Sequence, residues 1–285
     1  MSDIQSKVLI VRPSISQVGK SKTDKEITAE VHNQHGVEDE SGQYVKKLWP
    51  KEFIAPFTKI VGEASRYHKR HTVVSQFGDL IPTVQFERYR EAMDAYIQQF
   101  NDAADDFAAN YDAIIERARQ IHNGTFKEEF YPIREKIREE FSFTLFTAPV
   151  PRTTDLSVSY IDEERIVALR AEIEQSVSNA GKMASAQVIK RILECVNRIA
   201  VTLGDQDAIF RNSMIDNLKE MLNLAPALNI ADDPAVTQLI HECATKLVKD
   251  PDSLRNSSFQ RKTTAVLASQ IAETFGKMGG RKLAA

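Results

Sequence analysis

"TVQFERYREAMDAYIQQFNDAADDFAANYDAIIERARQIHNG", residues 83–124, is the longest periodic stretch of the sequence and the strongest indication of its fold. Gly124 is a typical end for a helix. Apolar residues recur along the stretch at steps of three and four, the spacing of one helix face. They are Tyr89, Met93, Tyr96, Phe100, Ala103, Phe107, Tyr111, Ile114, Ala118 and Ile121. The stretch therefore predicts one continuous helix with an apolar seam about 50 Å long at 1.5 Å per residue.

A second apolar stripe follows between residues 166 and 203 and is long enough to cover that seam. Its members are Ile166, Leu169, Ile173, Val177, Val188, Ile192, Val196, Ile199 and Leu203. "NAGKM" (179–183) is the place where this helix would kink. We expect the two helices to form an antiparallel pair within one chain, and the remaining apolar surface to join subunits of a homo-oligomer. Further helices are predicted at 56–71, 126–140, 206–224, 233–249 and 257–277.

Strands are predicted in two places. "KVLIVRPSIS" (7–16) is rich in β-branched residues, and "FSFTLFTAPVP" (141–151) alternates before it ends at two prolines; "LSVSY" (156–160) could pair with it. Residues 17–45 are polar and aperiodic, which predicts a long loop. The fold class is mainly α (α+β), with a long helical hairpin, further helices and a small β-sheet. We expect an N-terminal α+β part (1–160) and a C-terminal helical part (161–285), packed as one globular unit.

Composition limits the class of partner. The chain has 285 residues and a net charge of −3, so binding to a polyanion would require a local patch of cations. Cys195 and Cys243 lie far apart, which is typical of a reducing compartment without a disulfide framework. The apolar run near the N-terminus is too short for a signal peptide, and no run approaches the length of a membrane span. We therefore expect a cytoplasmic protein that does not enter a membrane.

Catalytic signatures are absent from the sequence. Gly19-Lys20-Ser21 resembles the end of a phosphate-binding loop, but the required first glycine is replaced by Ser14. Histidines three residues apart, at 32 and 35 and at 68 and 71, lack the further ligands that zinc requires. The sequence predicts no catalytic residue, no metal site and no cofactor, and a protein that is not an enzyme. Some acidic pairs could bind a cation or serve as acid and base, although a solvated helix surface or cap accounts for them better; they are Asp105-Asp106, Glu128-Glu129 and Asp232-Asp233.

Cations and aromatic rings concentrate in "YVKKLWPKEFIAPFTKIVGEASRYHKRH" (44–71). Seven basic and two acidic residues give residues 43–71 a charge of +5, whereas residues 87–140 carry −5. On a helix from residue 56, the apolar arc would hold Phe57, Ile60, Val61, Ala64, Tyr67, His68 and His71. The opposite arc would hold Lys59, Arg66, Lys69 and Arg70, and a mixed cluster precedes the helix, made of Lys46, Lys47, Trp49, Lys51 and Phe53.

This combination is what single-stranded nucleic acid requires, because cations follow the phosphates and flat side chains stack on unpaired bases. The alternative is that the rings fill the core and the cations only face water. Trp49, the only tryptophan, could belong to either group. Lys20, Lys22 and Lys25, in the predicted loop, could wrap a flexible strand. These three lysines and the nine residues from Lys46 to Arg70 named above form the predicted nucleic-acid site.

Several segments resemble a family of phage-encoded proteins, most of which have no assigned function. They are "KKLWPKEFIAPFTKIVGEASRYHKRHT", "FGDLIPTVQFERYREAM", "FAANYDAIIERAR", "FYPIREKIREEFSFTLFTAPVPRTTDL" and "FRNSMIDNLKEMLNLAPALNIADDP". Within it, the sequence is most similar to the single-stranded-DNA-binding RNA polymerase cofactors (Drc) of lytic phages that carry their own RNA polymerases. The resemblance implies a mainly helical binder without an OB barrel, located in the host cytoplasm. Its partners would be single-stranded DNA at melted promoters and the phage RNA polymerase.

Another function remains open at this point. Related phage genes accompany a MoxR-type AAA+ ATPase and a von Willebrand A protein, so the resemblance also allows a non-enzymatic adaptor of that pair. Binding to a labelled oligonucleotide that weakens with salt would favour the first function. Stimulation of the ATPase without DNA binding would favour the second.

Overall fold

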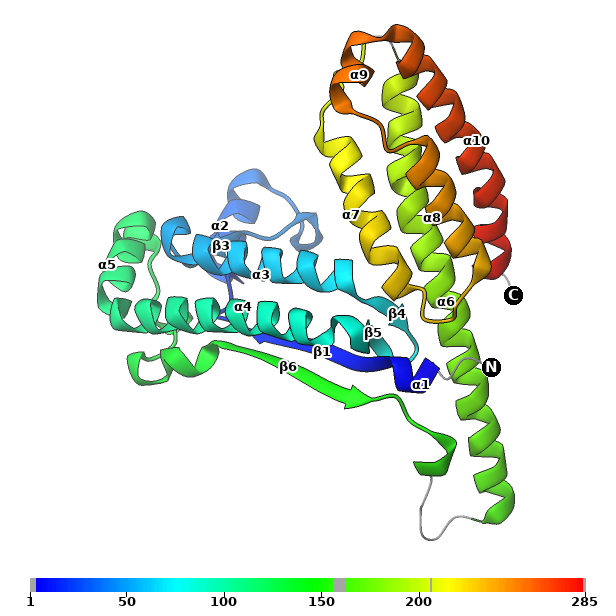
Figure 1. The fold of residues 1–285 in the computed structure, drawn as a ribbon. Helices are drawn as coiled ribbons and strands as arrows, with labels where there is room; N and C mark the ends of the chain where they lie inside the picture. Colours follow the sequence, from blue (N-terminus) through cyan, green and yellow to red (C-terminus); the bar gives the residue numbers. More distant parts are fainter. Residues whose placement is uncertain (1–3, 156–161, 206, 284–285) are drawn as a thin grey trace. The chain divides into compact units, whose positions relative to one another are not determined.

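The computed structural model describes residues 4–155, 162–205 and 207–283, and the fold is mainly α with a small antiparallel sheet, as predicted (Figure 1). Contacts divide the chain into two compact units. The first contains residues 1–12, 69–89 and 147–285, and the second contains residues 13–68 and 90–146. This division differs from the predicted boundary at residue 160, because residues 1–12, with the first part of the N-terminal strand, and residues 69–89 are grouped with the C-terminal helices.

The larger sheet has four strands in the order β4-β5-β1-β6. The strands predicted at 7–16 and 141–151 are confirmed as β1 (Val8–Ser16) and β6 (Ser142–Pro149). A hairpin of β4 (Val73–Ser75) and β5 (Gly78–Pro82) was not predicted; β5 pairs with β1 from Val8↔Pro82 to Val11↔Asp79. The strand predicted at 156–160 lies outside the described residues.

One edge of this sheet is closed by a side chain. The main-chain N–H of Val74 in β4 donates to Gln187 Oε1 at 2.9 Å, and Gln187 Nε2 donates to the Val74 carbonyl at 2.7 Å. Gln187 lies on α6 (Glu163–Gly204). Its amide therefore makes the two hydrogen bonds that a neighbouring strand would make.

Long helices form most of the first unit. They are α6, α7 (Ser213–Leu228), α8 (Pro234–Lys246) and α10 (Ser258–Leu283), with two short helices, α1 (Ile4–Lys7) and α9 (Pro251–Asn256), and a 3-10 turn (Thr153–Asp155). "NAGKM" does not end α6, and its Gly181 leaves room for Ile4, whose Cδ1 would lie 2.7 Å from a Cβ at that position. Cys195 and Cys243 are free thiols.

The predicted pairing of the two long apolar stripes is wrong. The α6 stripe from Ala180 to Leu203 is buried in an aliphatic core with residues of α7, α8 and α10. The seam of residues 89–121 instead packs on α3 (Lys51–His71), where the ring centroids of Phe57 and Phe100 are 5.3 Å apart. Periodicity indicates which face is apolar, but the partner depends on shape, and here rings pack with rings.

The seam also runs through two helices rather than one. α4 (Thr83–Ala109) ends at Asn110, and α5 (Tyr111–His122) continues in a different direction (Figure 1). Asn110 has φ −95° and ψ 12°, and its side-chain Nδ2 donates to the Asp106 carbonyl at 2.8 Å. A short polar side chain that bonds to the preceding turn competes with helix continuation, which explains the break.

Two further segments of the second unit differ from the prediction: the predicted loop contains a strand and a helix, and one predicted helix is not α-helical. The predicted loop contains β2 (Ser21–Thr23) and α2 (Lys25–His35), and β2 pairs with β3 (Val45–Lys47). α3 begins at Lys51, so Pro56 lies inside the helix rather than at its start. The helix predicted at 126–140 is instead a series of 3-10 turns. The 3-10 segments of this unit are Asp39–Ser41, Asn123–Thr125, Glu128–Phe130 and Arg134–Glu140.

Candidate nucleic-acid interface

The α3 helix has the two faces that its sequence predicts. Phe57, Ile60, Ala64, His68 and His71 are buried, and the remaining members of the apolar arc are half-buried. The cations of the opposite arc are exposed; they are Lys59, Arg66, Lys69 and Arg70. The period of the helix therefore separates the rings and histidines from the cations.

Four of the exposed cations on α3 have no ion-pair partner among the residues that the structure describes: Lys51, Lys59, Arg66 and Lys69. We call these four residues the α3 cation row; it spans about 27 Å at 1.5 Å per residue. Arg70 is different, because its guanidinium is ion-paired with Glu220. Arg66 Nη1 lies over Gly62, 3.6 Å from the position that a Cβ there would take.

The β2–β3 ribbon brings further lysines to the surface. At the end of the ribbon, the Leu48 N–H donates to the Lys20 carbonyl at 3.0 Å. The Lys20 ammonium in turn donates to Thr58 Oγ1 on α3 at 3.4 Å, next to Lys59 in sequence. Lys47 and Lys25 are also exposed. Lys20 therefore extends the α3 cation row sideways, and this lysine lies close to the helix as the predicted site requires.

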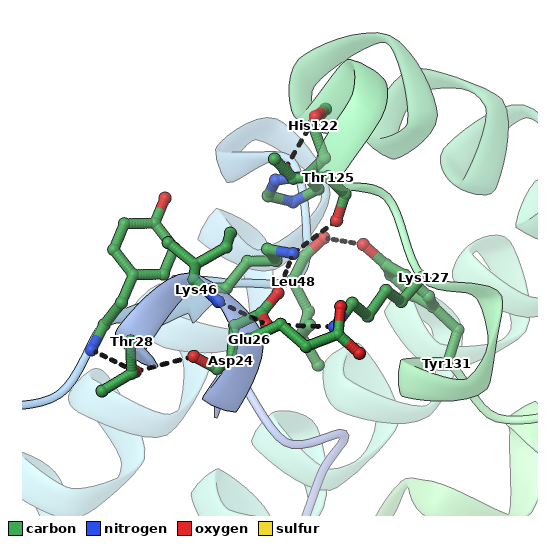
Figure 2. Close-up of polar contacts among 11 residues, drawn as sticks. Asp24, Glu26, Thr28, Lys46, Leu48, His122, Thr125, Lys127 and Tyr131 are labelled. Carbon is green, nitrogen blue, oxygen red and sulfur yellow. Dashed lines mark hydrogen bonds and ion pairs between the residues drawn. The ribbon is translucent and has the colours of Figure 1, made fainter. Parts of the chain in front are cut away.

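Lys22 and Lys46 lie opposite one another in the ribbon and contact the ring of Phe130. The Lys22 ammonium is 4.5 Å from the ring centroid, and that of Lys46 is 5.5 Å away. Lys46 is only 2% exposed and is ion-paired at 2.6 Å with Asp24, which is fully buried (Figure 2). The prediction of Lys46 as a surface contact for nucleic acid is therefore wrong, because its charge is buried and already neutralised.

Asp24 is the centre of this buried cluster. Its carboxylate accepts from Lys46 at 2.6 Å and from Lys127 at 3.1 Å, and Lys127 also reaches Glu26 at 2.7 Å (Figure 2). The hydrogen bond from Lys46 is the main reason that the pKa of Asp24 falls to about 2. The Lys46 ammonium also donates to the Thr125 carbonyl. The cluster thus connects the ribbon to the chain that follows α5.

Trp49 is also buried, with 7% of its surface exposed. Its ring packs edge-on against Tyr131 and Phe107, with centroids 5.1 and 5.3 Å away. Its Nε1 donates to the Gly19 carbonyl at 2.8 Å. Trp49 is therefore a core residue and cannot stack on a base at the surface, so its predicted role in the site is wrong. Phe53 is half-buried.

An exposed ring that the sequence does not single out lies at the other end of the ribbon. Tyr44 is 45% exposed. Its main-chain N–H and its main-chain carbonyl are both hydrogen-bonded. Its N–H donates to Thr28 Oγ1 at 3.0 Å, and its carbonyl accepts from the Asp24 N–H at 3.0 Å. Tyr44 is about 13 Å from Leu48 at 3.3 Å per strand residue. Its place at the start of the basic stretch was the only sequence signal for it.

A cavity of about 580 Å³ lies elsewhere in the second unit, between α5 and the 3-10 turns. Arg119 and Arg134 line it, and Arg134 is ion-paired with Asp112. Burial raises the pKa of Tyr111 and Tyr131, in its wall, to about 12. Carboxylates outnumber cations in this wall, so it is a poor match for phosphate. The carboxylates are Asp112, Glu116, Glu128, Glu129 and Glu135.

In comparisons with known proteins, no family model, no curated protein and no solved structure matches the chain. Among the described residues, histidines, cysteines and carboxylates nowhere gather in a group of three that could hold a metal ion. Within the described ranges, no helix is both long enough and apolar enough to cross a membrane.

Proposed function

We propose that the protein binds single-stranded DNA along the exposed face of α3. The observation that carries this proposal is the α3 cation row, Lys51, Lys59, Arg66 and Lys69, which has no ion-pair partner among the described residues. Lys20 and Lys47 lie in or beside the ribbon that leads to this helix. Cations without a carboxylate partner are free to replace the counterions of a phosphate backbone.

The strand would be held mainly through its phosphates. The large rings of the basic stretch, Trp49 and Phe57, are buried, so they cannot supply stacking. Tyr44 is the exposed ring of this stretch, and we propose it as the stacking contact. Binding should therefore depend strongly on salt and weakly on base sequence.

The biological role that we propose is that of a cofactor that recruits a phage RNA polymerase to melted promoters. This role rests on the resemblance to the phage-encoded family. A protein in this role would need one surface for the single strand and another for a protein partner.

The test compares two matched double variants in a titration of a fluorescently labelled single-stranded oligonucleotide. Lys59→Ala/Arg66→Ala removes two cations of the α3 row. Lys182→Ala/Lys190→Ala removes two exposed lysines of α6 and serves as the control. We expect the first variant to bind more weakly, and its slope of log K against log salt to become shallower by about 0.7 for each phosphate that the variant no longer binds. The control should bind like the wild type.

Two results would contradict the proposal. One is duplex DNA that competes as well as or better than single-stranded DNA at equal salt. The other is a salt slope that changes equally in both double variants, because the effect would then be one of net charge rather than of the α3 row. A variant Tyr44→Ala that binds with unchanged affinity would remove only the stacking contact.

A further inference from the structure

The turn that follows α5 has a strained main chain at Asn123. Asn123 and Gly124 are the only adjacent asparagine and glycine in the sequence, and both are exposed. Asn123 has φ 43° and ψ −124°, close to the values of about 60° and −120° at the first central residue of a type II′ turn. Glycine ordinarily takes this position, because a positive φ strains a residue that has a Cβ. The chain therefore holds Asn123 in a conformation that residues with a Cβ rarely adopt.

This conformation turns the next main-chain nitrogen toward the asparagine side chain. In an L residue, the Cβ atom and the following nitrogen eclipse one another about the Cα–C bond when ψ is about −120°, because the substituents of a tetrahedral Cα lie about 120° apart. Asn123 has nearly this ψ, so the Gly124 nitrogen lies on the same side as the Asn123 Cβ. The Asn123 carboxamide makes no hydrogen bond among the described residues, so rotation about Cα–Cβ can bring its Cγ to that nitrogen.

We propose that Asn123 is a site of spontaneous deamidation, at which the main chain itself supplies the nucleophile. The Gly124 nitrogen attacks Cγ of Asn123 and loses its proton to hydroxide, the carboxamide C–N bond breaks, and ammonia leaves with a proton from water. An intramolecular attack of this kind is fast when the reacting atoms are held close together. Water then opens the five-membered imide. Opening at Cγ gives aspartate, and opening at the main-chain carbonyl carbon gives isoaspartate.

Gly124 favours this reaction without being required by the fold. It has no side chain to obstruct closure of the imide ring. A Cβ at Gly124 would meet no atom within 4 Å, and its φ is not positive, so alanine fits there without strain. Gly124→Ala therefore separates the chemistry from the structure, because it hinders ring closure and keeps the turn.

The modification would act on the buried ion cluster. The Thr125 carbonyl accepts from the Lys46 ammonium, and the Thr125 hydroxyl donates to the His122 carbonyl at 2.8 Å (Figure 2). Isoaspartate lengthens the main chain between His122 and Thr125 by one atom. We expect the modified chain to lose the contact between Thr125 and Lys46 and to unfold at a lower temperature. The proposal holds whether or not the chain binds DNA.

The test incubates the full chain at physiological temperature, at neutral and at alkaline pH, and follows its digested peptides by mass spectrometry. Asn256 is the control within the same chain, because it is also exposed, is followed by Ser257 and lies in the last turn of α9. We expect the amide of Asn123 to become an acid at least about tenfold faster than that of Asn256, and faster at alkaline pH. Gly124→Ala should slow the reaction at Asn123 about tenfold, with an unchanged circular dichroism spectrum.

A synthetic peptide of residues 117–130 gives the rate of the same pair in an unfolded chain. The folded chain should react at least as fast, because its turn already has the required ψ. A slower reaction in the folded chain, equal rates at Asn123 and Asn256, or an unchanged rate in Gly124→Ala would overturn the proposal. Aged wild-type protein should melt below fresh protein, whereas aged and fresh Gly124→Ala should melt alike. Deamidated wild-type protein that melts like the fresh protein would overturn the effect on the ion cluster.

Discussion

The two units have cores of different chemistry. In the second unit the rings of Trp49, Phe57, Phe107 and Phe141 pack on one another, and Phe57 stacks on Phe141 with centroids 4.6 Å apart. In the first unit the buried cluster is aliphatic apart from Phe210, Phe275 and the sulfur side chains of Met221 and Cys243. Tryptophan and tyrosine rings carry a polar tip that needs a hydrogen-bond partner, whereas aliphatic side chains do not.

This difference determines what each core can hold in place. Trp49 Nε1 donates to the Gly19 carbonyl at 2.8 Å, and the Tyr131 hydroxyl donates to the Leu48 carbonyl at 2.9 Å. The ring core therefore fixes irregular chain, including the end of the β2–β3 ribbon at which Gly19 and Leu48 lie. The aliphatic core has no such polar groups, so its elements are held by shape alone, as where Ile4 of the short α1 packs against Gly181 of α6.

Among the variants that test the difference between the two cores, the largest effect is expected at Trp49. Trp49→Ala should lower the free energy of unfolding by about 3–5 kcal/mol, because it leaves a cavity among the rings and an unpaired Gly19 carbonyl. Urea unfolding followed by circular dichroism measures the loss. Trp49→Phe keeps most of the ring volume and should cost less. A variant Trp49→Ala as stable as the wild type would show that the ring core does not hold the second unit together.

A somewhat smaller loss is expected at the buried ion cluster. Asp24→Asn should lower the free energy of unfolding by about 3 kcal/mol, because it leaves the Lys46 charge buried without its partner. Asp94→Asn breaks the exposed Arg90–Asp94 pair, where about 0–1 kcal/mol is expected. Thermal unfolding of the two variants at neutral pH gives the comparison. Equal losses in both would mean that the Asp24 site is as solvated as the surface.

The pH dependence of the Asp24 cluster has a defined direction. The pKa of Asp24 is about 2 in the folded protein, below its ordinary value of 3.8. Its stabilisation is therefore complete above the ordinary value and is lost as the pH falls from there toward 2. In Asp24→Asn this part of the acid limb should be missing.

The smallest expected effect is a loss of stability at alkaline pH, which is absent at neutral pH. The pKa of Tyr111 and of Tyr131 is raised from 10.0 to about 12, and that of the Cys243 thiol in the bundle from 9.0 to about 12. These groups lose their protons at a lower pH in the unfolded chain than in the folded one. The stability of the ring core should therefore fall as the pH rises through 10, and that of the aliphatic core as it rises through 9. Titration of the tyrosinate absorbance should show a late phase that shrinks in Tyr131→Phe. A single phase at the ordinary pKa would show that neither ring is buried.

Local patterns predicted most of the long helices and the strands β1 and β6, but they missed α2 and the β4–β5 hairpin and did not predict which elements pack together. The period of residues 56–71 placed Phe57 inside and Lys59 outside, as the structure confirms. Most of the seam is also buried as predicted, although Ile121 at its end is 50% exposed, but the choice between α3 and α6 as its partner depends on long-range shape. The break at Asn110 depends on one side-chain hydrogen bond, which leaves no trace in a hydrophobic period.

The candidate site shows the same limit. Lys46 and Lys47 are adjacent and chemically alike, yet the ribbon buries one and exposes the other. What holds Lys46 inside includes the Thr125 carbonyl, 79 residues away, and the ring of Phe130. Charge alone suggested that both lysines lay at the surface, because a buried lysine can be recognised only when its partner is known.

The amide of Gln187 gives the sheet a property that its own strands lack. An edge strand such as β4, with Val74 half exposed to solvent, is a template on which another chain can add a strand and start aggregation. The two hydrogen bonds from Gln187 occupy the Val74 main chain, so that an incoming strand finds no free donor or acceptor at this residue. The side chain of Gln187 on α6 thus protects the edge strand β4 from pairing with another chain at Val74.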